Sequence, residues 1–365
     1  MFHPLARIAV PMTLLAVVAA GCSSSDDSVA SSTSSLAPVT TIAPTTTTAA
    51  PTTTTSTVAP TTTEATVAIG NTVNGLPAED ELEERRVVAI KIDNHPKARP
   101  QSGLDTADAV YEILVEGGLT RFIALFHQSD SDYVGPNRSG RPTDSTVITG
   151  LNGAPFQISG AQPWVQQIFR KDGINVVYDN GVTTGRISSR SAPQNLYTSS
   201  LRIRDWADDR GWDDETPGNL FMYGEPTPGE DEATKIRVEF SDSAPANWAW
   251  DGEKYLRFNG TVPHEWVDKE GSRGQVAFDT IVTMKMRRYT KSDPSGQGSS
   301  VPAMETVGTG DAFVFFNGEV VGGTWERGSN ADLFTLTDAD GVEIVLPPGR
   351  VWISFVPNTR TITWE

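Results

Sequence analysis

The sequence predicts an α+β protein in which a layered α/β lobe with a mixed sheet precedes a mostly antiparallel β lobe. Three observations predict this class. Between residues 77 and 225, buried-strand patterns alternate with helix patterns, which is typical of a sheet covered by helices. Between residues 235 and 365, short strand patterns are separated by tight-turn dipeptides. Residues 22–70 precede both lobes and have the composition of a disordered tether.

The first 21 residues have the layout of a bacterial signal peptide. Arg7 precedes an apolar run from Ile8 to Ala20, and the small residue Gly21 stands directly before Cys22. This run is shorter than the roughly 20 residues that a transmembrane helix needs. The residues that end at Cys22 also resemble a bacterial lipobox. We therefore expect lipidation of Cys22 and anchoring at the extracytoplasmic face of the cell membrane; a soluble secreted protein cleaved elsewhere is the alternative.

The predicted tether contains almost only Ser, Thr, Ala, Pro and Val, with no Lys, Arg or aromatic residue between positions 23 and 69. Such a segment cannot bury enough apolar surface to fold. As a flexible coil it would span about 40 Å on average, and as an extended polyproline helix about 145 Å. Both lengths would hold the lobes clear of the bilayer.

Cysteine content and charge exclude several classes of function. Cys22 is the only cysteine in 365 residues, so its lipidation would leave the folded part without a thiol nucleophile, a disulfide or a Cys-ligated metal. The chain has 29 Lys and Arg residues against 46 Asp and Glu residues, a formal net charge of −17. An acidic body makes nucleic acid an unfavourable partner. It also gives no general attraction to anionic lipid, so the acyl chain must hold the protein at the membrane.

In the first lobe, the pattern predicts a strand over Val87–Ile92 and a helix over Leu104–Glu116 that stops at Gly117-Gly118. The remaining elements expected before residue 225 are strands at Phe122–Phe126, Phe156–Ser159 and Ile174–Tyr178, and helices at Trp164–Arg170 and around Leu196–Asp209.

A passage rich in Pro, Gly and acidic residues, Glu225–Glu232, is a plausible boundary before the second lobe. In Ile281–Tyr289, apolar residues alternate with Thr283, Lys285 and Arg287, which predicts one buried face and one face in water. Hairpin turns are expected at Asp251-Gly252, Asn259-Gly260, Asn317-Gly318 and Asp340-Gly341.

Acidic residues form a stripe on the predicted helix Leu104–Glu116. Asp105 and Asp108 suit a solvated face, and Asp105 also suits the N-cap. Glu112 and Glu116 are stronger candidates for a binding site, because the tight turn after Glu116 could bring Arg121 close to them.

Two arginines follow the predicted Gly-Pro turn after the second strand. Arg138 and Arg141 offer the planar, bidentate donors that suit carboxylates or phosphates, or they pair internally with Glu112 or Glu116. We expect Arg121, Arg138 and Arg141 to gather near these two glutamates on one face of the lobe.

The dipeptide Asp93-Asn94 ends the first predicted strand, a usual position for binding residues in an α/β sheet. A satisfied turn is the simpler explanation for these two residues. If the binding site forms, we expect Asp93 and Asn94 at its rim.

No metal or cofactor is expected. His95, His127 and His264 do not form a spaced ligand cluster, and Asp268 stands where a zinc-protease motif needs its second His after His264. The sequence has no nucleophile elbow, Walker loop or dinucleotide glycine pattern. A hydrolase would have to use carboxylates as acid and base, such as Asp93 with Glu112 or Glu116.

Several segments in order resemble the YerB-like lipoproteins, a family catalogued as a domain of unknown function with amino- and carboxy-terminal parts. The resemblance covers roughly residues 75 to 360 and implies a two-domain α+β body on a lipoprotein anchor, with no activity attached. The segments that carry it are VAIKIDN (88–94), RPQSGL (99–104), ADAVYE (107–112), EGGLTRF (116–122), VGP (134–136), Arg138-Ser139, Arg141-Pro142, APQNLY (192–197), GGTW (322–325) and LPPGRVWI (346–353).

The sequence therefore favours a non-catalytic, membrane-anchored envelope lipoprotein. Its partner would be a cell-wall polymer, a small anionic ligand or a protein of wall synthesis, which a long tether suits. A carboxylate-dependent hydrolase acting on an envelope glycan or ester is the competing class, and a structural spacer is the third.

Overall fold

The computed structural model describes residues 73–77, 82, 85–213 and 215–365. The predicted signal peptide, the lipidation site at Cys22 and the tether 22–70 lie outside these residues. Within the described part of the chain, no helix is both long and apolar enough to cross a membrane.

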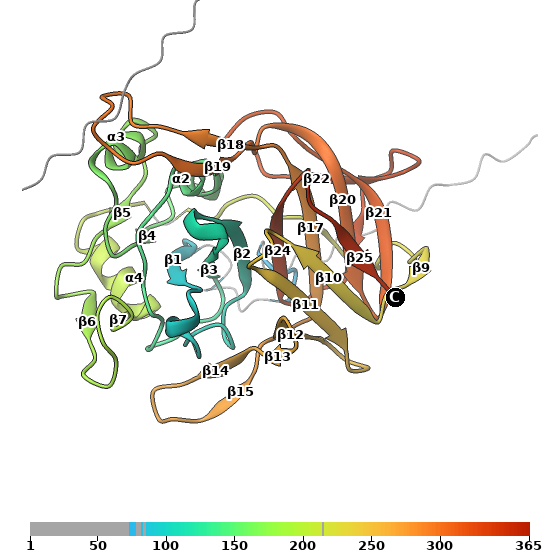
Figure 1. Cartoon of the computed structure of the whole chain (residues 1–365), viewed down its shortest axis with the longest axis horizontal. Helices are drawn as coiled ribbons and strands as arrows, with labels where there is room; N and C mark the ends of the chain where they lie inside the picture. The colour runs from blue at the N-terminus through green and yellow to red at the C-terminus, as the bar shows by residue number, and fades with distance from the viewer. Residues whose placement is uncertain (1–72, 78–81, 83–84, 214) are drawn as a thin grey trace, which may run out of the picture. The chain divides into compact units, whose positions relative to one another are not determined.

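A large mixed sheet forms the centre of the described protein (Figure 1). Its strand order is β22-β21-β20-β17-β24-β2-β3-β1-β4-β5, and β9 pairs with the side of β21. The bounds are β1 (Val88–Asp93), β2 (Ala109–Leu114), β3 (Thr120–Phe126), β4 (Phe156–Gln157), β5 (Val176–Val177), β9 (Asp231–Glu232), β17 (Thr280–Met286), β20 (Gly308–Phe316), β21 (Glu319–Arg327), β22 (Thr335–Asp338) and β24 (Val351–Pro357).

Strands from the two predicted lobes meet in the middle of this sheet. β2 pairs in parallel with β24, with Ala109 opposite Val351 and Ile113 opposite Phe355. On its other side β24 pairs in parallel with β17, whereas β2 pairs antiparallel with β3. Every residue of β2 and β24 is buried, so neither strand has an exposed edge or face.

A second, antiparallel sheet covers one face of the main sheet. Trp248 of this second sheet packs edge-on against Trp352 of β24, with ring centroids 5.2 Å apart. Figure 1 shows β10 and β11 lying across β17 and β24. The second sheet consists of β13 (Val262–Pro263), β12 (Tyr255–Asn259), β11 (Pro245–Trp250), β10 (Lys235–Glu239) and β25 (Ile362–Trp364), with β16 (Ala277–Phe278) beside β12.

Helices α2 (Pro142–Ile148) and α3 (Pro163–Lys171) pack on the opposite face, through residues such as Val147 and Phe169. The other elements are α4 (Ser200–Asp208), the short helices η1 (Pro96–Ala98), η2 (Glu116–Gly118) and η3 (Thr149–Leu151), and the strand pairs β6 (Thr184–Arg186) with β7 (Leu196–Thr198), β8 (Met222–Tyr223) with β23 (Val345–Leu346), β14 (Glu265–Val267) with β15 (Arg273–Gln275), and β18 (Arg288–Lys291) with β19 (Val301–Met304).

The predicted fold class is confirmed, but the helix predicted over 104–116 is wrong. Its second half is the strand β2. Because β2 is buried on both faces, its apolar residues form a nearly continuous run that matches helical spacing by chance. Asp108 is buried just before this strand and accepts hydrogen bonds from the main-chain N–H groups of His127 and Ser129, so it does not lie on a solvated face.

Two other segments differ from the prediction, and one predicted turn is confirmed. Thr283 is fully buried rather than facing water, because both faces of β17 are covered. The helix predicted around Leu196–Asp209 is divided into β7 and α4, and Ser199 is the N-cap of α4. The hairpin turn at Asn317-Gly318 is confirmed, since both residues have positive φ angles between β20 and β21.

We expect residues 73–365 to unfold in one cooperative transition, because separating the halves would expose the buried edges of β2 and β24. Scanning calorimetry of this fragment should give equal calorimetric and van't Hoff enthalpies. Two resolved transitions, one for each half, would contradict this expectation.

Candidate functional site

The predicted site residues lie around one end of the main sheet, where β1 ends and β3 begins. Asp93 is opposite Arg121 in the β1–β3 pair, so both side chains point to the face covered by α2 and α3. Glu112 is opposite Phe122 in the β2–β3 pair and points to the other face. The sheet therefore separates the predicted residues into two groups.

On the α2 face, the structure brings the three predicted arginines together with two of the predicted acids. Arg138 Nε lies 3.3 Å from Asp93 Oδ2. Arg141 Nε lies 2.8 Å from both carboxylate oxygens of Glu116. Arg121 Nη1 donates to the main-chain oxygen of Ser139 at 2.7 Å. We call Arg121, Arg138 and Arg141 the arginine cluster.

A buried ion pair fixes the loop that carries Arg138 and Arg141 of the arginine cluster. Lys91 Nζ and Asp144 Oδ1 are 2.6 Å apart, and neither side chain is exposed to solvent. Burial lowers the pKa of Lys91 to about 8, against the opposing effect of Asp144. Asp144 also accepts from the main-chain N–H of Arg141, while the main-chain N–H of Arg138 donates to Lys91. These contacts fix the loop that carries both arginines.

The guanidinium groups of the cluster are close enough to disfavour each other's charge. Burial and the charges of Arg141 and Arg138 together lower the pKa of Arg121 to about 10, against the opposing effects of Asp93 and Glu116. Burial would raise the pKa of Glu116, but hydrogen bonds and charge from Arg141 outweigh burial and the pKa is lowered. The Nε of Arg121 is buried and has no hydrogen-bond partner.

Solvent reaches this cluster mainly through its outer members. Arg138 has 28% of its side chain exposed and Glu116 has 38%. Arg121 is only 7% exposed. A ligand would therefore meet Arg138 first and Arg121 behind it.

On the opposite face, Glu112 is held by donors from three other strands. Arg257 Nη2 on β12 donates to both carboxylate oxygens at 2.8 and 2.9 Å. Thr120 Oγ1 on β3 donates at 2.7 Å, and Trp352 Nε1 on β24 donates at 3.0 Å. Glu112 and Arg257 are each 1% exposed, so this ion pair is shielded from water.

The contacts around Glu112 continue into a closed ring of hydrogen bonds. Arg257 Nη1 lies 2.5 Å from His264 Nδ1, and His264 Nε2 lies 2.8 Å from Gln101 Oε1. Gln101 then donates to Asn94 Oδ1 at 3.3 Å, and Asn94 donates to Thr120 Oγ1 at 2.7 Å. We call this set the buried ring; its members are Asn94, Gln101, Glu112, Thr120, Arg257 and His264.

Burial, together with the charges of Arg257 and Arg99, lowers the pKa of His264 well below its usual value. His264 is therefore neutral near pH 7, and its Nδ1 accepts from Arg257 while its Nε2 donates to Gln101. Every side chain in the buried ring has at least one partner, which compensates for burying so many polar groups.

Two of the sequence placements are corrected by this geometry. Glu112 lies on the opposite face from the arginine cluster, because it is in a strand and not on a helix. Asn94 is inside the buried ring rather than at a rim. Arg257 was not predicted as a site residue. The signal that could have indicated it is the alternation of β12, in which Tyr255 and Arg257 occupy the inward positions.

The described residues contain no group of three or more His, Cys, Asp or Glu side chains placed to hold a metal ion.

Comparison with known proteins assigns the chain to a family. Residues 73–213 match the N-terminal domain, and residues 236–353 the C-terminal domain, of the family described as "Protein of unknown function (DUF3048)". The chain belongs to this family. The arginine cluster falls in the N-terminal family domain, whereas Arg257 and His264 of the buried ring fall in the C-terminal one.

A relative from Bacillus subtilis (strain 168), named "Putative lipoprotein YerB", is 29% identical over 293 residues. The match covers 78% of this chain and 86% of the relative. A crystal structure of YerB protein from Bacillus subtilis superimposes with a TM-score of 0.68 at 27% identity, over 80% of this chain and 98% of that one. Both comparisons agree with the resemblance to the YerB-like lipoproteins.

We expect Arg257→Met to lower the free energy of unfolding by about 3 to 5 kcal/mol, because it leaves the carboxylate of Glu112 buried without its counter-charge. Urea unfolding of residues 73–365 measures the loss. Arg237→Met is the matched control: Arg237 lies on the outer face of the same sheet, pairs with the half-buried Glu239, and should cost no more than about 0.5 kcal/mol. Equal losses in the two variants would contradict a structural role for the buried pair.

Proposed function

We propose that this chain is a membrane-anchored envelope lipoprotein whose arginine cluster binds an anionic ligand. The observation that carries the proposal is the buried guanidinium of Arg121, whose Nε has no partner and whose neighbours Arg138 and Arg141 are also positive. A phosphate or carboxylate group would supply both the missing acceptor and the missing negative charge.

The charges at this site do not cancel within the protein. Lys91 and Asp144 neutralise each other, which leaves the three arginines of the cluster against Asp93 and Glu116. The site thus keeps an excess positive charge, although the whole chain has a net charge of −17. A local reversal of sign of this kind attracts anions to one place on an otherwise repelling surface.

The carboxylates support binding better than hydrolysis. Glu112 accepts hydrogen bonds from Arg257, Thr120 and Trp352 and is shielded from water, so a substrate proton cannot reach it. Asp93 and Glu116 are each paired with an arginine. An acid and base pair for glycoside or ester hydrolysis needs two carboxyl groups facing one open space.

The proposed anchor rests on the sequence and on family membership. Cys22 follows an apolar run and a small residue, and the Bacillus subtilis relative is named as a lipoprotein. Lipidation there would place both domains outside the cell, at the end of the tether, where anionic envelope components are the available ligands.

Arg138→Ala should abolish most anion binding. It should lower the free energy of unfolding by no more than about 1 kcal/mol, because Arg138 is partly exposed and its contact with Asp93 is long. Isothermal titration with inorganic phosphate measures binding, and urea unfolding measures stability. Arg237→Ala is the matched control, since Arg237 is an exposed arginine paired with Glu239 on the outer face of the second sheet. A loss of several kcal/mol in Arg138→Ala, or unchanged phosphate binding, would contradict the proposal.

Cys22→Ser should move the protein from washed membranes to the soluble fraction without changing its unfolding transition. The reason is that Cys22 supplies the acyl chain, whereas the folded residues lie beyond the tether. Cell fractionation with immunoblotting checks the location, and circular dichroism checks the fold. Retention of the variant in washed membranes would contradict the anchoring proposal.

A further inference from the structure

We propose that the ligand is a linear polyanion, with one anionic group at the arginine cluster and a second at Arg99 on the other side of the sheet end. This inference rests on the proposed function and extends it, because it names the class of ligand and adds a second subsite. Four observations support it: a fixed guanidinium, an adjoining hollow, a short distance between subsites, and a matching excess of charge.

Arg99 is held in one orientation by the residue at the end of β1. Its Nε donates to Asn94 Oδ1 at 3.0 Å, and its Nη2 donates to the main-chain oxygen of Asn94 at 3.1 Å. Nη1 takes part in neither bond. Because Asn94 belongs to the buried ring, the ring fixes the position of this guanidinium. A charge fixed in this way loses little conformational freedom when a ligand binds.

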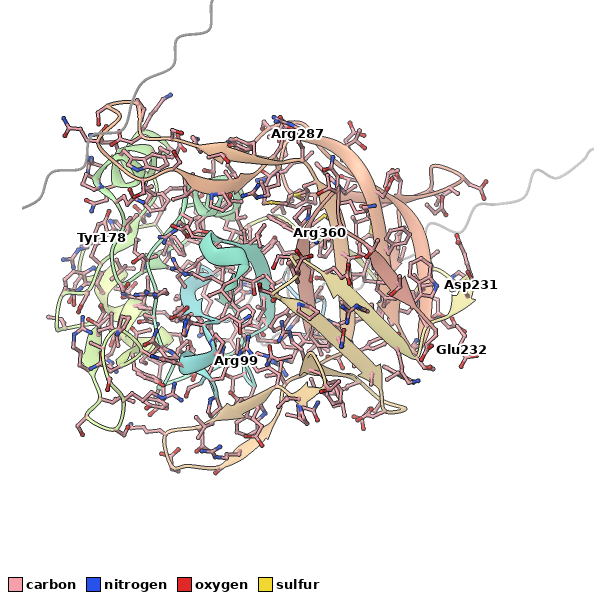
Figure 2. The ribbon with its side chains drawn as sticks, in the orientation of Figure 1. Arg99, Tyr178, Asp231, Glu232, Arg287 and Arg360 are labelled. Atoms are coloured by element: carbon pink, nitrogen blue, oxygen red, sulfur yellow. The ribbon has the colours of Figure 1, made fainter. Side chains whose placement is uncertain are left out.

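Arg99 borders a hollow of about 410 Å³ between η1 and the strands β12 to β14. Figure 2 shows Arg99 beside the chain segment that follows β1. Polar and apolar groups share the wall of this hollow: it is formed by Arg99, Pro100, Asn259, Val262, Pro263, His264 and Glu265.

The two subsites are close because they contact consecutive residues. Arg138 contacts the side chain of Asp93, and Arg99 contacts the side chain of Asn94. The Cα atoms of consecutive residues are about 3.8 Å apart, and each side-chain contact adds about 8 Å at most, so the two guanidinium groups lie within about 20 Å of each other, around the sheet end. A single chain with repeated anionic groups can span this separation, whereas one phosphate ion cannot.

The charges of the combined site also favour more than one anion. Glu112 and Arg257 cancel within the buried ring, and His264 is neutral. Glu265 in the wall of the hollow is paired with Arg273. With Arg99 included, four guanidinium groups remain against the carboxylates of Asp93 and Glu116, an excess of two positive charges. A ligand with two anionic groups would match this excess.

The pKa of Arg99 is lowered by burial and by a neighbouring positive charge. Burial and the charge of Arg257 lower it to about 10, against the opposing effects of Glu112 and Asp93. Arg99 is still fully charged near pH 7 and is therefore available to an anion.

The experiment compares a single anion with chains of anions. Isothermal titration uses inorganic phosphate, a linear polyphosphate of about ten units, and polyglutamate of similar length, with concentrations expressed per anionic group. We expect polyphosphate or polyglutamate to bind at least tenfold more tightly than phosphate on this scale. The polymer that binds more tightly identifies the preferred anionic group.

Arg99→Gln should weaken binding of the preferred polymer about tenfold and leave phosphate binding unchanged, because phosphate occupies only the arginine cluster. Arg138→Gln should weaken both. Arg287→Gln, which removes a more exposed positive charge far from Arg99 in Figure 2, should change neither. Arg99→Lys keeps the positive charge but not the planar guanidinium, so it should weaken polymer binding less than Arg99→Gln does. This variant separates a binding effect from a folding defect.

The possible outcomes separate this inference from the function on which it rests. If Arg138→Gln weakens phosphate binding but Arg99→Gln leaves polymer binding unchanged, the second subsite is wrong and the anion site stands. If the wild-type protein binds neither phosphate nor either polymer, the proposed function fails and the inference fails with it. Equal losses in Arg99→Gln and Arg287→Gln would also overturn the inference, because they would indicate a general effect of charge.

Discussion

The ion pair between Glu112 and Arg257 is the interaction on which the arrangement of the two family domains depends. Removing both charges from water is costly, and their attraction offsets this cost only when the remaining polar atoms are also satisfied. Here Thr120, Trp352 and His264 supply most of the additional hydrogen bonds. Because Glu112 comes from the N-terminal domain and Arg257 from the C-terminal one, neither domain can satisfy its charge alone.

This requirement has a consequence for the opposite face of the sheet. Asn94 and Thr120 belong to the buried ring, and their chain neighbours Asp93 and Arg121 point to the arginine cluster. The buried ring holds the backbone at the ends of β1 and β3, so it also fixes the positions of the side chains on the opposite face. The C-terminal domain contributes no side chain to the arginine cluster, yet through Arg257 it helps to hold the backbone on which the cluster is built.

Local patterns in the sequence predicted much of this fold and part of the site. The strands around Val88–Asp93 and Thr120–Phe126 follow from buried apolar runs, and the turn at Gly117-Gly118 brings Glu116 close to Arg121. Glu112 was misplaced because β2 is covered on both faces, so its apolar residues show no alternation that distinguishes a strand from a helix. Two of the three donors to Glu112, Arg257 and Trp352, are 145 and 240 residues away along the chain, and no local pattern carries information at that range.

If the arginine cluster binds an anion as proposed, the charge distribution would give it selectivity. The charge of Arg141 lowers the pKa of Arg121, so the two guanidinium groups repel each other and the folded protein must balance this repulsion elsewhere. Such an arrangement is favourable once an anion occupies it. The acidic remainder of the chain repels the same anions everywhere else, so it opposes nonspecific binding of long polyanions and limits the useful contact to the sheet end. Selectivity in the proposed function would then come from the contrast between a small positive site and a negative surface, not from the strength of any single contact.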